Sequence, residues 1–244
     1  MRTPVIHAML LSVALAGAAC RGDAMDASKA FPDPAVAALS QAAADGDAAA
    51  VRAAVAAGAD PNARGADQVT PLQFAMLAQS KAGVDALMAA GADASQPGLA
   101  GRTAVHSAAI ADDPDYLRIL LEHRADPDAR NGNTGGTALA DAAGPRTDAQ
   151  FRMLLDAGAD PTLADRTGNT PLHKAAMVNA GTHVLLLLEH GAPASAKNAQ
   201  DATFQPYYYK LPAAKLSDRA RAEREAVTAW LEGHGVPLEA AVGD

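Results

Sequence analysis

The fold is decided by one stretch of sequence, Asp165-Arg166-Thr167-Gly168-Asn169-Thr170-Pro171-Leu172-His173-Lys174-Ala175-Ala176. Thr170 is of a type favoured at the N-cap of a helix, because its hydroxyl can accept a hydrogen bond from a free backbone N–H. Pro171 is favoured at the first helical position, where its missing N–H needs no partner. The stretch therefore predicts a helix that begins at Pro171.

Two phrases recur along the chain at one nearly constant interval, which is the mark of a repeat protein. Thr-Pro-Leu-His or a variant of it occurs at residues 70–73, 103–106, 137–140, 170–173 and, in degenerate form, 203–206. A five-residue phrase that begins with Gly-Ala-Asp or a variant of it occurs at residues 58–62, 91–95, 124–128, 158–162 and 191–195. Both phrases keep a period of 33 or 34 residues, which chance similarity in an alanine-rich chain would not hold.

The two phrases together resemble the ankyrin repeat, in which Thr-Pro-Leu-His opens the first helix of a unit and Gly-Ala-Asp follows the second. The resemblance covers roughly residues 35–240. It implies an all-α solenoid of about six helix–turn–helix units with short β-hairpin or loop connections, each unit packing only against its neighbours. The expected units are residues 35–65, 66–98, 99–131, 132–164, 165–197 and 198–240.

The residues at the expected helix ends fit this repeat, with departures in two units. Left-handed backbone is needed after a helix, and glycine supplies it in four units, at Gly58, Gly91, Gly158 and Gly191. Arg124 takes this position in the third unit, where a positive φ would strain it by about 1 kcal/mol. In the fourth unit Gly144-Pro145 should shorten the first helix. Thr147 with Gln150 predicts a capping box for the second helix of that unit.

The first nineteen residues are predicted to be a secretory signal peptide. A positive charge at Arg2 precedes an apolar stretch over residues 8–16, and small residues follow. The apolar stretch is too short to span a bilayer. Residues 20–34 are then expected to be a flexible tether.

Cys20, the one cysteine of the chain, ends a Gly-Ala-Ala-Cys sequence that resembles a bacterial lipoprotein box. The resemblance implies that Cys20 is lipidated and, because residue 21 is Arg, that the protein is anchored to the outer membrane from the periplasm. Gly17 departs from the large aliphatic residue usual at its position. Cleavage after Ala18 or Ala19 without lipidation is the alternative.

Composition excludes several classes of function. The chain of 244 residues carries 20 Lys and Arg against 28 Asp and Glu, a net charge of −8. Nucleic acids and anionic membrane surfaces require clustered positive charge. One cysteine allows no internal disulfide and no cysteine-based zinc cluster. His183 and His190 lack a third ligand at metal spacing, and we expect no metal and no cofactor.

The resemblance implies that the hairpin tips and the first helices of the units bind a partner protein. The matching positions are Asp67, Val69, Leu77, Gln79, Leu99, Arg102, Ile110, Asp112, Asn133, Thr134, Arg146, Arg166, Asn169, Met177 and Asn179. The aromatic cluster at residues 207–209 adds Tyr207 and Tyr208, which either anchor a partner or cover the end of the array. His106 and His173 are expected to hold neighbouring hairpins through backbone hydrogen bonds.

The sequence thus predicts a protein-binding module of the bacterial cell envelope, a monomer on its own and not an enzyme. No converging cluster of titratable groups points to catalysis. Within this reading the partner is either a toxin that the chain neutralises or a periplasmic enzyme that it protects. A structural envelope component with only weak contacts is the remaining alternative.

Overall fold

The computed structural model describes residues 25–239, in which helices and loops account for the whole fold. The chain divides into two compact units, residues 1–104 and 105–244. The described residues form 13 α-helices and no strand, and one antiparallel bridge joins Arg130 to Thr137. The predicted all-α repeat fold is confirmed, whereas the predicted signal peptide and Cys20 lie outside the described residues. No helix between residues 25 and 239 has both the length and the apolar character that a membrane crossing requires.

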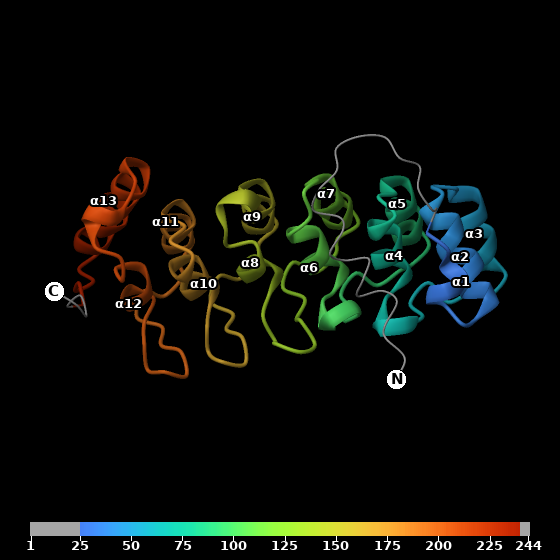
Figure 1. The fold of residues 1–244 in the computed structure, drawn as a ribbon, viewed down its shortest axis with the longest axis horizontal. Coiled ribbons are helices and arrows are strands. Elements are labelled where there is room, and N and C mark those ends of the chain that lie inside the picture. The colour runs from blue at the N-terminus through green and yellow to red at the C-terminus, as the bar shows by residue number, and fades with distance from the viewer. Residues whose placement is uncertain (1–24, 240–244) are drawn as a thin grey trace. The chain divides into compact units, whose positions relative to one another are not determined.

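The first unit is built from two layers of helices (Figure 1). In one layer α2 packs on α4, in the other α3 packs on α5, and each repeat joins the layers through the pairs α2–α3 and α4–α5. A fifth, short helix, α1, packs on α2. The helix bounds are Ala27–Ala30 for α1, Pro34–Ala44 for α2, Ala48–Ala56 for α3, Pro71–Leu77 for α4 and Lys81–Ala89 for α5.

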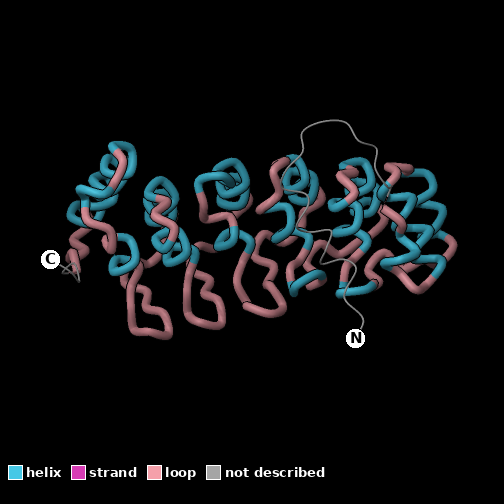
Figure 2. The backbone as a smooth tube through the Cα atoms, in the orientation of Figure 1, coloured by secondary structure: helices cyan, strands magenta, loops and turns pink. Residues whose placement is uncertain are grey.

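The second unit repeats the same two layers, with α8, α10 and α12 in one, and α7, α9, α11 and α13 in the other. The loops before α8, α10 and α12 all leave the same side of this unit (Figure 2). The helix bounds are Ala104–Ala109 for α6, Asp115–Glu122 for α7, Ala138–Asp141 for α8, Asp148–Asp156 for α9, Pro171–Met177 for α10, Gly181–Glu189 for α11, Gln205–Tyr208 for α12 and Asp218–Gly233 for α13.

The expectation of a flexible tether is wrong from Asp26 onward. Asp26 caps α1 by accepting a hydrogen bond from the N–H of Ser28, 3.0 Å away. Phe31, which follows this helix, is buried and lies edge-on to Phe74, with the ring centroids 5.7 Å apart. The apolar residues of this segment recur on one side of a helical turn, so they bury together against α2 and α4. The sequence predicts a tether because residues 21–34 as a whole show no apolar period.

The helix ends follow the sequence closely. Thr70 and Thr170 are N-caps, each in a reciprocal capping box, and a proline follows each of them. All four glycines predicted to follow helices have positive φ, between 86° and 98°. Arg124 adopts a φ of 61° at the equivalent position, so the predicted left-handed arginine is confirmed.

The fourth repeat departs from the others, as Gly144-Pro145 predicted, because α8 has only four residues. The predicted capping box of Thr147 and Gln150 is wrong. The hydroxyl of Thr147 instead donates to the carbonyl of Ala142 at 2.8 Å, which closes the turn after α8. The amide of Gln150 donates to the carbonyl of Ala111 at 2.7 Å, which ties α9 to the preceding repeat.

Candidate protein-binding surface

A side chain from the first helix of a repeat holds the loop that leads into the next repeat. His106 lies 3.1 Å from the carbonyl oxygen of Gly136, and His173 lies 3.1 Å from that of Ala202, both through Nε2. These contacts confirm the predicted tethers. Gln73 occupies the same position in the first unit, and its amide donates to the carbonyl of Arg102 at 2.8 Å. Each tether fixes a loop that would otherwise be free to move.

Every long loop of the second unit is also stiffened from within. One Asn or Asp at the same position in each loop accepts hydrogen bonds from two backbone N–H groups further along, a local arrangement that fixes a turn. The acceptors are Asn131 for residues 133 and 134, Asp165 for residues 167 and 169, and Asn198 for residues 200 and 202. The tips therefore present their outer side chains on a fixed backbone.

Neighbouring tips are joined to one another through Arg166. Its backbone N–H donates to the carbonyl of Thr134 at 2.9 Å. Its guanidinium donates to the carbonyls of Asn133 and, at 2.9 Å, Gly132. The structure thus brings together three of the residues predicted to bind a partner, and all three are exposed. Part of the guanidinium's hydrogen-bonding capacity is nevertheless used inside the protein.

Most of the predicted surface positions are accessible. The exposed ones are Asp67, Gln79, Arg102, Ile110, Asp112, Asn133, Thr134, Arg146, Arg166 and Met177. Four are half-buried, namely Leu77, Leu99, Asn179 and Tyr207. These residues come from both units, and each unit presents its own set.

Two predicted surface residues in the loops are buried, so their assignment to the binding surface is wrong. Val69 packs with Phe31 and Phe74 in the core of the first unit. The amide of Asn169 donates to the hydroxyl of Thr167 at 2.8 Å and accepts from the amide of Asn198 at 2.9 Å. Position within the repeat indicated a loop for both residues but not which way their side chains turn.

Tyr208 is also wrongly assigned to the binding surface, because its side chain is only 1% exposed. The guanidinium of Arg224, on α13, lies 5.6 Å from the ring centroid of Tyr208 and 5.5 Å from that of Tyr209. The same guanidinium donates to the carbonyl of Tyr208 at 2.9 Å and to that of Leu211 at 2.6 Å. Burial raises the pKa of the Tyr208 phenol far above its usual value. This aromatic cluster therefore belongs to the packing between α12 and α13.

Exposed apolar side chains mark the second unit at the ends of its first helices. Ile110, which follows α6, is 41% exposed, and Met177, the last residue of α10, is 43% exposed. Val178 comes next and is more exposed still. Large apolar side chains held in water at repeating positions favour contact with another protein.

Models of known protein families match two parts of the chain. A model of three ankyrin repeats matches residues 39–131, and a model of one ankyrin repeat matches residues 167–196. The chain belongs to the ankyrin-repeat family. Ankyrin repeats mediate interactions between proteins, and ankyrin-repeat proteins are typically binding modules without catalytic activity.

Among curated proteins, this ankyrin-repeat chain is similar to Protein PhlB of Serratia liquefaciens, with 44% identity over 119 residues. That match covers 49% of this chain and 52% of PhlB. It is also similar to neurogenic locus notch homolog protein 1 of Danio rerio, with 36% identity over 104 residues, covering 42% of this chain and 4% of that protein. The chain therefore spans about half the length of PhlB and a small part of the notch homolog.

Among solved structures, the ankyrin-repeat domain of Bcl-3 superposes with a TM-score of 0.66 at 27% identity, covering 82% of this chain and 86% of that one. An ankyrin-repeat domain from Acinetobacter baumannii gives a TM-score of 0.64 at 25% identity, covering 80% and 97%. A chain in the complex of a predatory endopeptidase from Bdellovibrio bacteriovorus with an immunity protein gives 0.59 at 23% identity, covering 80% and 97%. This last likeness concerns the fold alone.

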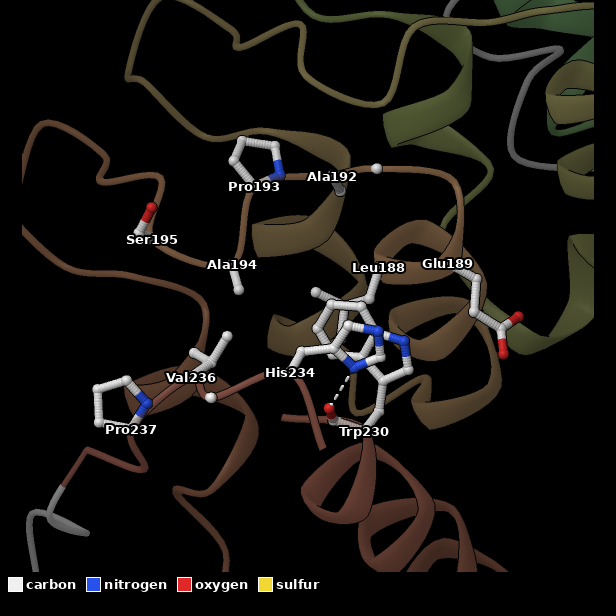
Figure 3. A pocket seen from close by; sticks show the side chains of 12 residues that line it. Leu188, Glu189, Ala192, Pro193, Ala194, Ser195, Trp230, His234, Val236 and Pro237 are labelled. Carbon is white, nitrogen blue, oxygen red and sulfur yellow. Dashed lines mark hydrogen bonds between the residues drawn. The ribbon is translucent and has the colours of Figure 1, made fainter. Parts of the chain in front are cut away.

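A pocket of about 740 Å³ lies in the ankyrin-repeat protein between the end of α11 and the end of α13 (Figure 3). Leu188, Pro193, Trp230 and Val236 supply much of its apolar lining. The indole of Trp230 stacks on the imidazole of His234, with the ring centroids 3.9 Å apart. The sequence holds no signal for this pocket beyond the single tryptophan, because its walls come from two segments, residues 188–195 and 230–237.

His183 has a carboxylate partner that its spacing from His190 could not reveal. Its Nε2 lies 3.1 Å from Oδ1 of Asp148, which is 35 residues earlier in the chain. Its ring stacks on that of Phe151, with the centroids 3.9 Å apart. Within residues 25–239 no group of three His, Cys, Asp or Glu side chains could hold a metal ion.

Proposed function

We propose that this protein binds a partner protein through the second unit, with Ile110 and Met177 as apolar anchors and the loop tips as the polar surroundings. The observation that supports this proposal is the exposure of both apolar side chains beside stiffened polar loops. Anchors of this kind dominate the energy of binding, while polar residues around them exclude water. The proposed role is that of a binder and not of an enzyme.

The stiffness of the loops supports this role on energetic grounds. A partner that meets a mobile loop must order it, at about 0.5–1.5 kcal/mol for each side chain immobilised. Here Asn131, Asp165 and Asn198 already hold the backbone of the tips. The guanidinium of Arg166 holds one tip against the next. Little further ordering is required on binding.

A pair of charge-introducing variants tests the surface. Ile110→Glu combined with Met177→Glu should weaken partner binding at least about tenfold, because a charge would be buried in the apolar part of the contact. The measurement is affinity capture from an envelope extract, followed by titration with the purified partner. Leu238→Glu is the matched control, since Leu238 is an equally exposed apolar residue at the far end of the unit. If the double variant and the control bind alike, the proposed surface is wrong.

We also propose that the protein is exported and anchored to the outer membrane through Cys20. This rests on residues 1–20, whose pattern is that of a signal peptide with a lipoprotein-like end. Mass spectrometry of the mature N-terminus should find a lipid-modified cysteine, and Cys20→Ser should move the protein from the membrane fraction to the soluble periplasm. A mature chain that begins after Ala18 or Ala19 with an unmodified thiol would exclude the anchor and leave export intact.

The captured partner would also distinguish the specific roles. A toxin whose activity falls on binding indicates an immunity function, and a periplasmic enzyme whose activity persists or rises indicates a protective one. Recovery of many proteins in sub-stoichiometric amounts, unaffected by the double variant, would indicate a structural envelope component.

A further inference from the structure

A second concave feature of the second unit lies away from the loop tips, where three helices begin. It is a groove of about 470 Å³ between the start of α9, the turn from α10 to α11, and the start of α13. Polar and charged side chains line it, among them Arg152, Asn179, Thr182, His183, Arg219 and Glu223. This groove holds more charged side chains than the pocket beside Trp230, and they favour a polar ligand.

The two carboxylates of the groove are already engaged by the protein. Asp148 lies 3.0 Å from Nε of Arg152 and 3.1 Å from Nε2 of His183. The hydrogen bond from Arg152 is the main cause that holds the pKa of Asp148 below its usual value, and the hydrogen bond from His183 lowers that pKa further. Glu223 accepts from Nε of Arg219 at 2.8 Å and from the hydroxyl of Thr182 at 3.1 Å. Neither carboxylate is left to attract a cation.

The two guanidinium groups, in contrast, keep donors to spare. Among the described residues, Arg152 and Arg219 each donate a hydrogen bond only through Nε. The two terminal nitrogens of each group therefore face solvent or the groove, and the side chains are 47% and 79% exposed. A guanidinium fork of this kind matches the paired oxygens of a carboxylate or phosphate.

The start of α11 adds further donors to the same place. This helix of nine residues has no side-chain cap, so the backbone N–H groups of Gly181 and Thr182 have no partner within the helix. Free N–H groups at a helix start favour negative charge. A Cβ at residue 181 would lie 2.5 Å from the hydroxyl of Tyr208 and 2.6 Å from Cβ of Glu223. Only glycine at this position therefore lets α12 and α13 pack this closely against α11.

His183 supplies an independent observation. Its side chain is only 2% exposed, it lines the groove, and its Nδ1 has no hydrogen-bond partner. Since Nε2 donates to the ionised Asp148, Nδ1 is the unprotonated nitrogen of the neutral ring. Burial lowers the pKa of His183, and the charged groups that act on the ring are Asp148 and Arg152 on α9 and Glu223 on α13, with Arg219 on the same groove. A negative charge in the groove would favour the protonated ring.

We propose that this groove binds an anionic oxygen group, a carboxylate or a phosphate, between the guanidinium groups of Arg152 and Arg219. The start of α11 lines the same groove, and the engaged carboxylates position the two arginines. Binding draws a proton onto His183 from solvent. Neither Ile110 nor Met177 lines the groove, although Asn179, two residues after Met177, does.

Titration of the whole protein with defined probes tests the site. The probes are inorganic phosphate and a blocked tri-glutamate peptide, and the tri-glutamine peptide and sodium chloride at matched ionic strength are the controls. Saturable amide shifts should appear at residues 148–152, 180–183 and 219–223 in NMR spectra with at least one anionic probe. The pKa of the His183 ring, followed in the same spectra, should move upward on binding. The stronger of the two anionic probes identifies the preferred group as phosphate or carboxylate.

Variants of the two arginines test whether these side chains bind the anionic probes. Arg152→Gln with Arg219→Gln should weaken probe binding at least about tenfold while leaving the circular dichroism spectrum unchanged. Arg118→Gln is the matched control, because Arg118 also pairs with carboxylates on an exposed helix face but lies outside the groove. Shifts that do not saturate, that sodium chloride reproduces, or that Arg118→Gln reduces equally would overturn the proposal. Because no protein partner takes part, failure here leaves the proposed protein-binding surface unaffected.

Discussion

At the scale of single residues, the helix-end position of Arg124 is the clearest departure from a repeating pattern. Four repeats place glycine there, with positive φ and with no atom near the missing Cβ. Arg124 takes the same conformation at 61° and must bear the strain that its Cβ creates. The sequence predicted this conformation because it is set locally, by the neighbours within one helical turn.

Arg124→Gly should therefore stabilise the protein by about 1 kcal/mol, seen as a higher urea midpoint. Gly158→Ala is the reverse control. Its Cβ would meet nothing within 4 Å, so its expected loss of about 1 kcal/mol would come from the backbone alone. A midpoint that stays constant or falls for Arg124→Gly would contradict this account.

Side-chain direction was predicted less well than backbone conformation, and three residues explain why. Val69, Asn169 and Tyr208 were each placed in the right segment and assigned to the wrong side of it. Their burial depends on partners distant in sequence, such as Arg224 for Tyr208 and Phe31 for Val69. A repeat pattern records which position a residue holds, whereas distant partners decide whether that position faces water.

At the scale of elements, the tether between repeats depends on one position. It is Gln73 in the first unit, and His106 and His173 in the second. Ala140 holds this position in the fourth repeat and has no side chain that could reach the next loop. The fourth repeat thus combines a four-residue first helix with the loss of a tether.

Hydrogen exchange should accordingly be fastest in the fourth repeat among those of the second unit. We expect the amides of α8 to exchange at least about tenfold faster than those of α10, because fewer buried contacts oppose local opening. Mass spectrometry of peptides from residues 137–147 and 170–180 would measure the difference. Equal protection of the two peptides would show that the tether and the helix length do not control local stability.

The tethering histidine also makes stability depend on pH. Burial is the main cause that lowers the pKa of His173, so below about pH 6.5 the unfolded chain binds a proton that the folded protein resists. Stability should then be full above this pH and fall as the pH drops through it. His183, whose pKa burial also lowers, contributes in the same direction.

His173→Gln should flatten this dependence, because glutamine at residue 73 already makes the same tether without titrating. We expect the variant to lie within about 1.5 kcal/mol of the wild type at pH 7.5. It should lose less stability than the wild type between pH 7.5 and 5.5, as measured by urea unfolding at each pH. A variant with an unchanged pH slope would assign the effect to His183 alone.

At the scale of the whole molecule, stability is a sum of units and of the contacts between neighbours. The helix α13 is the last helix of the described residues, and it covers α11 with Val227 and Leu231, both fully buried. Its outer side carries charged residues, among them Arg221 and Glu225, which are both exposed. The last repeat therefore closes the second unit, although its sequence matches the repeat pattern poorly.

Leu231→Ala should destabilise the second unit by about 2–5 kcal/mol, the usual range for a fully buried leucine. Leu238→Ala, at an exposed leucine of the same region, should change stability by less than about 0.5 kcal/mol. Hydrogen exchange in the Leu231 variant should rise first in α11, which contacts α13, and leave α2 and α3 unchanged. Uniform loss of protection would mean that the chain unfolds in one cooperative step.

The tether has a consequence for how such a chain can change its length. One partner comes from a side chain of one repeat and the other is a backbone carbonyl of the next, and both keep the same place in the three repeats that have the tether. An in-register duplication or deletion of one such repeat would consequently give the new neighbour a tether of the same kind. Ala140 makes no such bond, so a cut in the gene at that repeat would break none.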